Sequence, residues 1–457
     1  MILAGVLLLV IVLILMEVPI ALALLAGGAA GIVLSQEFSS ATAVIGNTPF
    51  TAASSYELLV IPMYILLGSL LANAGIGQQI YRSVHRLVHR LPGGLAVSVV
   101  GATALFSGIS GSSAADVAAF GRISVSEMSR YGYNKAYAAA VVAAAGTFAN
   151  LIPPSLGIVI YGIVAKESVG KLILAGVVPG LISMLVLAIF VAVRAMRNPG
   201  SGVAGVSAGA AAAPSAPADI VGGPLAGAVR NQPGFLTDSV GLVYGLVIFC
   251  IAVGGLYGGL FTPTEAGGVA ALAALMIAWL TPRSTRLRPL GAIIRASLVE
   301  TSQFTSMIFL LLVGGAVFSY FLAVEGFAAS LAEWTATLQI EPKLLVALIL
   351  VVLLPLGMLL EGLAIVLLAI PVLHPVVTGL GFDGVWFAIL ALKVIEVGLI
   401  MPPFGVNVFV SAGVNGLPAH SVFRYVLPFA ALDLAITAAF FLFPELVLWL
   451  PRIAGYK

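Results

Sequence analysis

The feature that most constrains this sequence is the recurrence of apolar runs long enough to cross a membrane. A helix needs roughly 20 residues to span a hydrocarbon core of about 30 Å, and such runs follow one another through the 457 residues. Hydrophobic residues make up 61% of the chain and charged residues only 8%, against about a quarter charged in an ordinary soluble domain. Because too few polar side chains remain to cover a water-facing surface, we predict a polytopic membrane protein.

The expected fold class is all-α, since the runs are too continuously apolar for the alternating strands of a membrane β-barrel. The first run lacks the basic flank and the cleavage pattern of a removable signal peptide, so we expect it to be retained. The apolar segments are predicted near 2–35, 57–75, 92–118, 136–164, 172–194, 237–258, 266–281, 302–323, 344–378, 385–411 and 425–450.

Composition also excludes several functions. The formal net charge of +2 predicts no nucleic-acid partner, and the lone Cys250 permits no internal disulfide. The sequence contains no phosphate-binding loop of the Walker type, which argues against an ATP-driven pump. We therefore expect a protein whose transport, if any, is driven by an ion gradient and needs no cofactor.

The distribution of charge predicts which connections face the cytoplasm. Basic residues gather in four clusters, which the positive-inside rule places inside; acidic connectors between other runs are interpreted as external. The basic clusters are Arg82, Arg86 and Arg90; Arg122, Arg130 and Lys135; Arg194 and Arg197; and Arg283, Arg286, Arg288 and Arg295. The acidic connectors hold Glu37 and Glu57, and Glu325, Glu333 and Glu341 beside Lys343.

These side assignments agree with one another only if two segments enter the membrane and return. The run 92–118 lies between two basic clusters, so it begins and ends inside. The run 344–378 lies between external connectors, so it begins and ends outside. Both are predicted to be re-entrant helical hairpins that enter from opposite faces.

Each predicted hairpin is followed by a helix that a Pro-Pro pair interrupts. The expected first tip, Ser110, lies 43 residues before Pro153, and the second, Glu361, lies 41 residues before Pro402. Matched spacing with opposite orientation is typical of inverted repeats, whose binding sites lie between discontinuous helices near the midplane. The alternative is that the two prolines merely kink packed helices.

The expected organisation is thus two repeat halves and a linker. The N-terminal half, 1–198, holds scaffold helices, the hairpin 92–118 and the broken helix 136–164. The C-terminal half, 237–457, holds scaffold helices, the hairpin 344–378 and the broken helix 385–411. Residues 199–236 are rich in Gly, Ala, Ser and Pro, which predicts a flexible cytoplasmic linker.

The first tip and the helix breaks offer oxygen ligands for a small hard cation. Pro-Pro leaves upstream carbonyl groups without helical partners, and Ser110, Ser112, Thr147, Asn150 and Asn407 add hydroxyl and amide oxygens. We therefore expect Na⁺ to bind there. Half-helix N-termini at the same breaks suit a substrate carboxylate. Serine-rich tips are also common packing devices between helices.

The second predicted hairpin and the helix that follows it each contain one carboxylate, and burying a charge within the membrane is expensive and indicates function. Glu361 and Glu396 are expected either to neutralise a cation or to pair with Lys393 or a helix N-terminus. By contrast, Glu265 is predicted to cap a helix that starts at Thr262 or Thr264. The isolated acids Glu17 and Asp433 are expected to be structural.

One rival from another class is an intramembrane serine protease, because residues 108–111 have the Gly-x-Ser-Gly form that such enzymes use. A serine nucleophile needs a base within hydrogen-bond reach. The four histidines are His85 and His89 in a basic loop, His374 at the end of the second hairpin and His420 in another loop. None is obviously placed to serve Ser110, and a protease leaves the duplicated hairpins unexplained, so no enzymatic activity is expected.

At these motifs the sequence resembles the large membrane subunit of TRAP transporters, the tripartite ATP-independent periplasmic uptake systems. The resemblance covers nearly the whole chain apart from the linker. It is carried by LFSGISGSSAA from Leu105, LIPPS from Leu151, GGLYGGLFTPTEA from Gly254 and EVGLIMPPFGVN from Glu396.

The resemblance implies an elevator-type secondary carrier driven by Na⁺ in the inner membrane of a bacterium or archaeon. Its partners would be a small membrane subunit of about four helices and an extracytoplasmic binding protein that delivers an organic acid. The implied cation-binding residues are Ser110, Gly111, Ser112, Asn150 and Pro153, then Gly357, Gly398, Pro402 and Asn407; Thr147 is expected only from its hydroxyl near the first break. The expected substrate-binding residues are Ser113, Ser155, Glu361 and Glu396.

The sequence departs from the family pattern at the second site. Met401 stands where the family usually has Thr, and Glu361-Gly362 stands where Asp-Pro is common. The linker is also unlike the usual charged connector. The alternative function is a stand-alone Na⁺- or H⁺-coupled anion carrier of the same broad architecture that needs no binding protein.

Overall fold

The computed structural model describes residues 2–36, 38–197, 240–281, 289–327, 330 and 340–455. Secondary structure within these ranges is entirely helical, as predicted. The predicted linker 199–236 lies outside the described residues, and so do five of the charges used to assign sides: Glu37, Arg283, Arg286, Arg288 and Glu333.

The chain begins with helices that the apolar runs predicted only in part. They are α1 (Ile2–Leu15), α2 (Ile20–Ser35), α3 (Phe38–Ala53), the 3-10 turn η1 (Tyr56–Leu59), α4 (Val60–Asn73) and α5 (Ile76–Val88). Residues 2–35, expected as one segment, form two helices because the chain turns at Glu17, which has a φ of 63°, and at Pro19. Helices α3 and α5 were not predicted.

The first hairpin and broken helix follow. The hairpin is α6 (Gly94–Ser110) and α7 (Ser113–Arg130); the broken helix is α8 (Lys135–Ala145), the 3-10 turn η2 (Gly146–Phe148) and α9 (Leu156–Ala165); α10 (Val169–Arg197) closes this half. The second arm of the hairpin therefore runs past the predicted end at 118. The apolar run stops there, but the helix continues through residues that include Arg122 and Glu127.

The second half repeats this order after a group of long helices. That group is α12 (Val240–Phe249), the π-helical turn η3 (Cys250–Gly254), α13 (Gly255–Tyr257), α14 (Pro263–Leu280) and α15 (Leu290–Val324). The hairpin is α17 (Pro342–Leu359) and α18 (Gly362–Gly379), the broken helix is α19 (Gly384–Gly398) and α20 (Val406–Val414), and α21 (Ala419–Leu442) and α22 (Glu445–Ile453) complete the chain.

The two halves match in register around their Pro-Pro pairs. Helices α6 and α17 each end 43 residues before Pro153 or Pro402, and α8 and α19 each begin 18 residues before them. The residues before α8 and α19, Asn134 and Asp383, each accept two backbone N–H groups as N-caps. Both Pro-Pro bonds are cis. The elements around the two Pro-Pro pairs therefore follow the same spacing in both halves.

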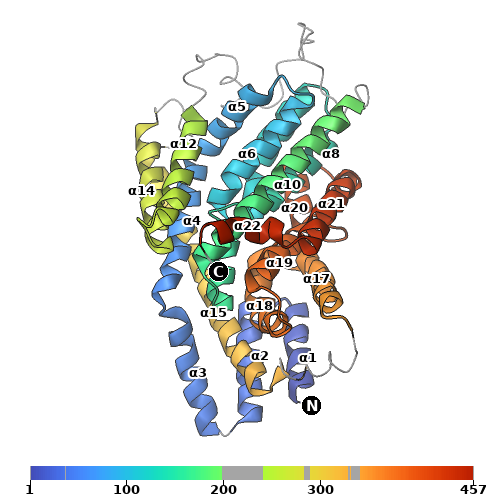
Figure 1. Cartoon of the computed structure of the whole chain (residues 1–457). Helices are drawn as coiled ribbons and strands as arrows, with labels where there is room; N and C mark the ends of the chain where they lie inside the picture. Colours follow the sequence, from blue (N-terminus) through green and yellow to red (C-terminus); the bar gives the residue numbers. More distant parts are fainter. Residues whose placement is uncertain are drawn as a thin grey trace.

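Packing crosses between the halves in a matched way. The second arm of the first hairpin, α7, packs on α20, and the second arm of the second hairpin, α18, packs on α9. Every residue of α19 is buried, as are residues 136–145 of α8. Around this centre, α15 packs on α2 and α4, and α12 and α14 lie with α4 and α5 along one side (Figure 1).

Eight helices in the described part of the chain are long and apolar enough to cross a membrane. They include both arms of the second hairpin, Pro342–Leu359 and Gly362–Gly379. Length and composition do not distinguish a crossing from a re-entrant arm. The side assignments that make 344–378 re-entrant therefore stay a prediction.

Candidate functional site

Four elements meet at one buried carboxylate, that of Glu396 in α19. At the start of α7, Ser113 Oγ lies 2.9 and 2.7 Å from the two Glu396 carboxylate oxygens. Asn150, in the first break, donates from its Nδ2 to Glu396 Oε1. A β-carbon added at Gly362, which begins α18, would lie 3.1 Å from Asn150 Nδ2. We call Ser113, Asn150, Gly362 and Glu396 the junction, because both hairpins and both broken helices contribute to it.

Glu396 is held at the junction by neutral donors. Its side chain is fully buried, and its bonds within the described chain come from a hydroxyl and an amide. Lys393, one helical turn earlier, forms an ion pair with Asp433 at 2.6 Å. The sequence left open an ion pair of Lys393 with Glu361 or Glu396. In the structure, Lys393 instead pairs with Asp433, which lies in α21.

The Lys393–Asp433 pair also holds Thr147. Thr147 Oγ1 lies 2.8 Å from the Ala144 carbonyl and 3.3 Å from Asp433 Oδ2. Its hydroxyl, expected as a cation ligand, is thus directed at a structural ion pair. Asp433 is thus engaged by both Lys393 and Thr147, and its structural role stays a prediction.

Asn407 lies beside the junction with an amide that the described chain leaves without a hydrogen-bond partner. Its side chain is fully buried, and neither Oδ1 nor Nδ2 has a partner among the described residues. A β-carbon at Gly146 would lie 3.3 Å from both Asn407 Nδ2 and the Ser113 carbonyl oxygen. The Asn407 N–H donates at 3.0 Å to the carbonyl of Leu399, which precedes the second break.

Buried oxygens without donors are the feature a hard cation needs. Asn150 Oδ1, 4% exposed as a residue, also lacks a partner in the described chain. Asn150 bonds Glu396 through its Nδ2, so its free Oδ1 belongs to a residue of the junction, and Asn407 adds a second free amide oxygen beside it. Among the described residues no three His, Cys, Asp or Glu side chains gather as a transition metal would require. These residues therefore fit Na⁺ better than zinc or iron.

The first hairpin tip is fitted closely to the helix that follows the first break. Gly111 has a φ of +65°, and a β-carbon there would lie 2.7 Å from Leu156 Cβ at the start of α9. Ser112 Oγ accepts the Ala115 N–H at 3.4 Å as the N-cap of α7, and Ser155 Oγ accepts the Ile158 N–H at 3.3 Å as the N-cap of α9. The side chain of Ser110 lies outside the described part.

The second hairpin makes its closest contact through two glycines. A β-carbon at Gly398 would lie 2.6 Å from the Gly357 α-carbon, so α17 and α19 touch backbone to backbone. Glu361, an exposed residue, accepts the Leu363 N–H at 3.1 Å and caps α18. It therefore occupies the place that Ser112 has in the first hairpin, 41 residues before the Pro-Pro pair.

The two breaks differ in how they are covered. Pro153 is buried beneath α10, where a β-carbon at Gly176 would lie 3.6 Å from its ring. Pro402 is half-buried, and Pro403 and Phe404 after it are exposed. The first break is thus enclosed and the second opens toward the outside of the protein.

Sequence reasoning missed a second buried carboxylate, Asp116 in α7. Ser107 Oγ in α6 donates to Asp116 Oδ2 at 2.5 Å, so the pair joins the two arms of the first hairpin. Both residues are fully buried. The signal was available, since Asp116 is the one charged residue within the predicted hairpin 92–118.

Two histidines of the described chain, which are candidate bases for the rival hydrolase, have partners away from the first tip. His85 contacts Ser98 at 3.0 Å. His374 contacts the Tyr161 hydroxyl at 3.0 Å and the Glu167 carboxylate at 3.3 Å. Both contacts are therefore away from the Gly-x-Ser-Gly segment.

A cleft of about 1140 Å³ opens between α9, α10 and α18 on one side and α4, α14 and α15 on the other. Its charged lining residues are Glu57, Lys166 and Glu167, and its hydroxyl groups include those of Ser55, Ser168, Thr264 and Ser319. Val159 and Leu367 extend the lining along α9 and α18 toward the ends that carry the first break and the second tip. Its size suits a small organic ligand.

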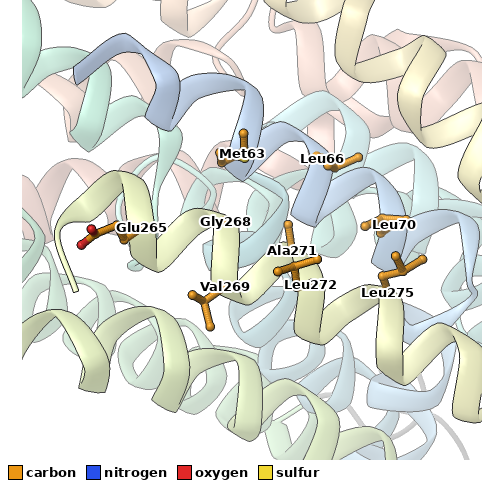
Figure 2. A pocket seen from close by; sticks show the side chains of 9 residues that line it. All are labelled: Met63, Leu66, Leu70, Glu265, Gly268, Val269, Ala271, Leu272 and Leu275. Atoms are coloured by element: carbon orange, nitrogen blue, oxygen red, sulfur yellow. The ribbon is translucent and has the colours of Figure 1, made fainter. Parts of the chain in front are cut away.

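A smaller hollow of about 430 Å³ lies between α4 and α14 and is almost wholly apolar (Figure 2). Glu265 is its one charged lining residue, and it is engaged in a capping box with Thr262, as predicted from sequence. The hollow thus offers a polar ligand little to bind.

The chain matches a family model over residues 7–446, that of the tripartite ATP-independent periplasmic transporter, DctM component. A C4-dicarboxylate TRAP transporter large permease of Pseudomonas aeruginosa is 33% identical over 89% of this chain and 88% of its own. A sialic acid TRAP transporter large permease of Vibrio cholerae is 32% identical over 88% of each chain. The solved YdaH transporter of Alcanivorax borkumensis has a TM-score of 0.63, 14% identity and 91% coverage of both chains, which shows a shared fold.

Proposed function

Because this chain belongs to the DctM component family of tripartite ATP-independent periplasmic transporters, we propose that it moves a small organic acid inward, driven by Na⁺. The family consists of transporter permeases, so the chain is a multi-pass membrane transporter and not an enzyme. The proposed partners are a small four-helix membrane subunit and an extracytoplasmic binding protein that delivers the substrate.

The observation that carries the cation proposal is the unpartnered amide of Asn407 beside the junction. Two buried amide oxygens, Asn407 Oδ1 and Asn150 Oδ1, lack donors in the described chain, and the buried carboxylate of Glu396 has only neutral donors there. A buried charge without a counterion is strongly unfavourable. A monovalent cation would supply the missing charge and occupy the free oxygens.

The same geometry suits alternating access. We take the transport domain to be the two hairpins and the two broken helices, α6–α9 and α17–α20, and the scaffold to be α2–α5 and α12–α15. The matched register and the matched packing of α7 on α20 and of α18 on α9 support inverted repeats within the transport domain. The cleft between α9 and α18 on one side and α4 and α15 on the other supports movement of one body against the other.

The substrate class follows from the relatives and from the helix breaks. Relatives are named for C4-dicarboxylate and for sialic acid, and both are organic acids. The second break, at which Pro403 and Phe404 are exposed, leads into the N-terminus of α20, and a helix N-terminus stabilises a carboxylate. We therefore propose a small carboxylic acid as substrate.

The cation site is tested with Asn407→Ala in proteoliposomes that hold this chain and its partners. We expect the Na⁺ concentration for half-maximal uptake to rise by about tenfold, since one ligand of about 1.4 kcal/mol is lost. The matched control is Ser411→Ala, one turn along α20, which removes a hydroxyl bonded to the Ala139 carbonyl at 2.8 Å. Unchanged Na⁺ dependence in Asn407→Ala, or an equal change in Ser411→Ala, would contradict the site.

A further inference from the structure

The transport domain offers an anionic substrate no free cation at its centre. The junction contains a carboxylate, Glu396, and the second tip another, Glu361. Lys393 is buried and paired with Asp433 at 2.6 Å. At this region an organic acid would therefore meet two carboxylates that only the proposed Na⁺ offsets, so a side-chain cation that attracts the acid must lie elsewhere on its route.

Lys166 is the one cation among the residues that line the cleft. It is an exposed residue at the C-terminal end of α9. Of the two acids that share the cleft, Glu167 lies 3.3 Å from His374, which itself is 6% exposed, and Glu57 lies on the other wall, in η1. The Lys166 ammonium is thus available on the wall that belongs to the transport domain.

The backbone at Lys166 argues against a purely structural role. Lys166 has a φ of 57°, a conformation that L residues rarely adopt and in which glycine is preferred at a helix C-terminus. The turn is closed by backbone bonds alone, such as that from the Glu167 N–H to the Gly162 carbonyl at 2.9 Å. Glycine could make the same turn with less strain, so the lysine side chain is not needed for the cap. Strained residues at clefts are often functional.

We propose that Lys166 binds the acid group of the substrate in the cleft, as an entry site that precedes binding at the hairpin tips. The site would take a carboxylate or sulfonate, held by the ammonium group and by nearby hydroxyls such as that of Ser168. This inference rests on the proposed function. It adds an anion-selecting residue on the transport-domain wall of the cleft.

The test is protection of a reporter cysteine, in liposomes without any binding protein. Cys250, an exposed cysteine, is first replaced by serine, and Ser55→Cys is introduced on the scaffold wall of the cleft. The rate of maleimide labelling is then measured against increasing concentrations of succinate, sialic acid, isethionate and ectoine. Because no binding protein is present, an effect of Lys166 on the docking of that protein cannot alter the labelling rate.

We expect at least one of these acids to slow labelling, and Lys166→Gln and Lys166→Gly to weaken that protection by about five- to tenfold. Lys166→Arg should retain it. The control is Lys171→Gln, which removes a lysine at 3.6 Å from Asp383 and should leave protection unchanged. Lys166→Gly should also melt no lower than the parent, which separates ligand binding from helix capping.

Three results would overturn the inference: no protection by any of the four acids, equal protection with and without the Lys166 ammonium, or equal losses in Lys166→Gln and Lys171→Gln. Uptake is measured in parallel with the complete system. If uptake proceeds but protection does not depend on Lys166, this inference alone is overturned. If protection depends on Lys166 but the Na⁺ gradient drives no uptake, the proposed function alone is overturned.

Discussion

At the scale of single residues, one contact that joins the two halves is the hydrogen bonding of Ser113 to Glu396. It links the start of α7 to the last turn of α19 at 2.7 and 2.9 Å, and both residues are buried. A hydrogen bond to a charged group contributes about 1.5–3 kcal/mol, and leaving the carboxylate short of a donor adds a desolvation penalty. The junction therefore stabilises the packing of α7 against α19, in addition to the cation-binding role proposed for it.

A double-mutant cycle measures this contact. Ser113→Ala and Glu396→Gln should each lower the free energy of unfolding, and the double variant should lose less than the sum, with a coupling energy of about 1–3 kcal/mol. The measurement is denaturant-induced unfolding of the purified protein in detergent. Additive losses would show that the two side chains do not interact.

A second cycle addresses the buried pair Lys393–Asp433. Removing the lysine alone leaves a buried aspartate without its counterion, which costs about 3–5 kcal/mol, whereas replacing both by apolar residues can be nearly neutral. We therefore expect Lys393→Met to reduce the yield of folded protein strongly and Lys393→Met with Asp433→Leu to restore it. Size-exclusion profiles of detergent extracts report both. A double variant as poorly folded as the single one would contradict this assignment.

At the scale of secondary-structure elements, the contact between α17 and α19 depends on glycine. A β-carbon at Gly398 would approach the Gly357 α-carbon to 2.6 Å and the Leu354 carbonyl oxygen to 2.8 Å. Gly398→Ala should therefore push the two helices apart and destabilise the protein by about 1–3 kcal/mol.

The matched control for this contact is Gly413→Ala in α20, where nothing lies within 4 Å of the added carbon. There the substitution should be neutral or stabilising by up to about 1 kcal/mol, because alanine is the better helix former. Thermal unfolding in detergent compares the two variants. Equal melting temperatures would mean that the backbone contact is not tight.

The sequence predicted the elements whose signal is local. Pro153 and Pro402 mark the breaks because proline cannot continue a helix hydrogen-bond ladder. The tips were placed within two residues of the turns at Gly111 and Leu360, because small residues and a capping acid follow apolar runs. Glu265 was identified as a capping group with Thr262 or Thr264 as the N-cap, and the structure shows the capping box with Thr262.

Other features had no such local signal. Helix α3 carries polar residues through its length and α5 is basic and amphipathic, so neither forms an apolar run. The partner of Lys393 lies 40 residues away on α21, and only packing brings it close. The bonds of Ser113 and Asn150 to Glu396 cross more than 240 residues of sequence. The sequence could therefore name the expected ligands in each half, but it could not show that the two sets lie together.

At the scale of the whole molecule, the proposed transport requires the transport domain to move against the scaffold. The helices α15 and α18 touch across this boundary, since a β-carbon at Gly315 would lie 3.2 Å from the Leu367 carbonyl oxygen. Cysteines at these two positions, joined by a short thiol-specific cross-linker, should abolish uptake, and reductive cleavage of the linker should restore it.

The control pair lies within the scaffold. Met63 and Gly268 face each other across α4 and α14, with 3.9 Å between the Met63 sulfur and a β-carbon at Gly268 (Figure 2). Cross-linking cysteines there should leave uptake intact. Full uptake with α15 and α18 cross-linked would show that the two bodies do not move past one another at this contact.

The most direct test of the whole account is uptake of labelled organic acids by proteoliposomes that hold this chain and its small membrane partner. Uptake is measured with and without the binding protein, and with and without an inward Na⁺ gradient. The account predicts accumulation only when the gradient and the binding protein are both present. Accumulation without the binding protein, or without dependence on Na⁺, would contradict it.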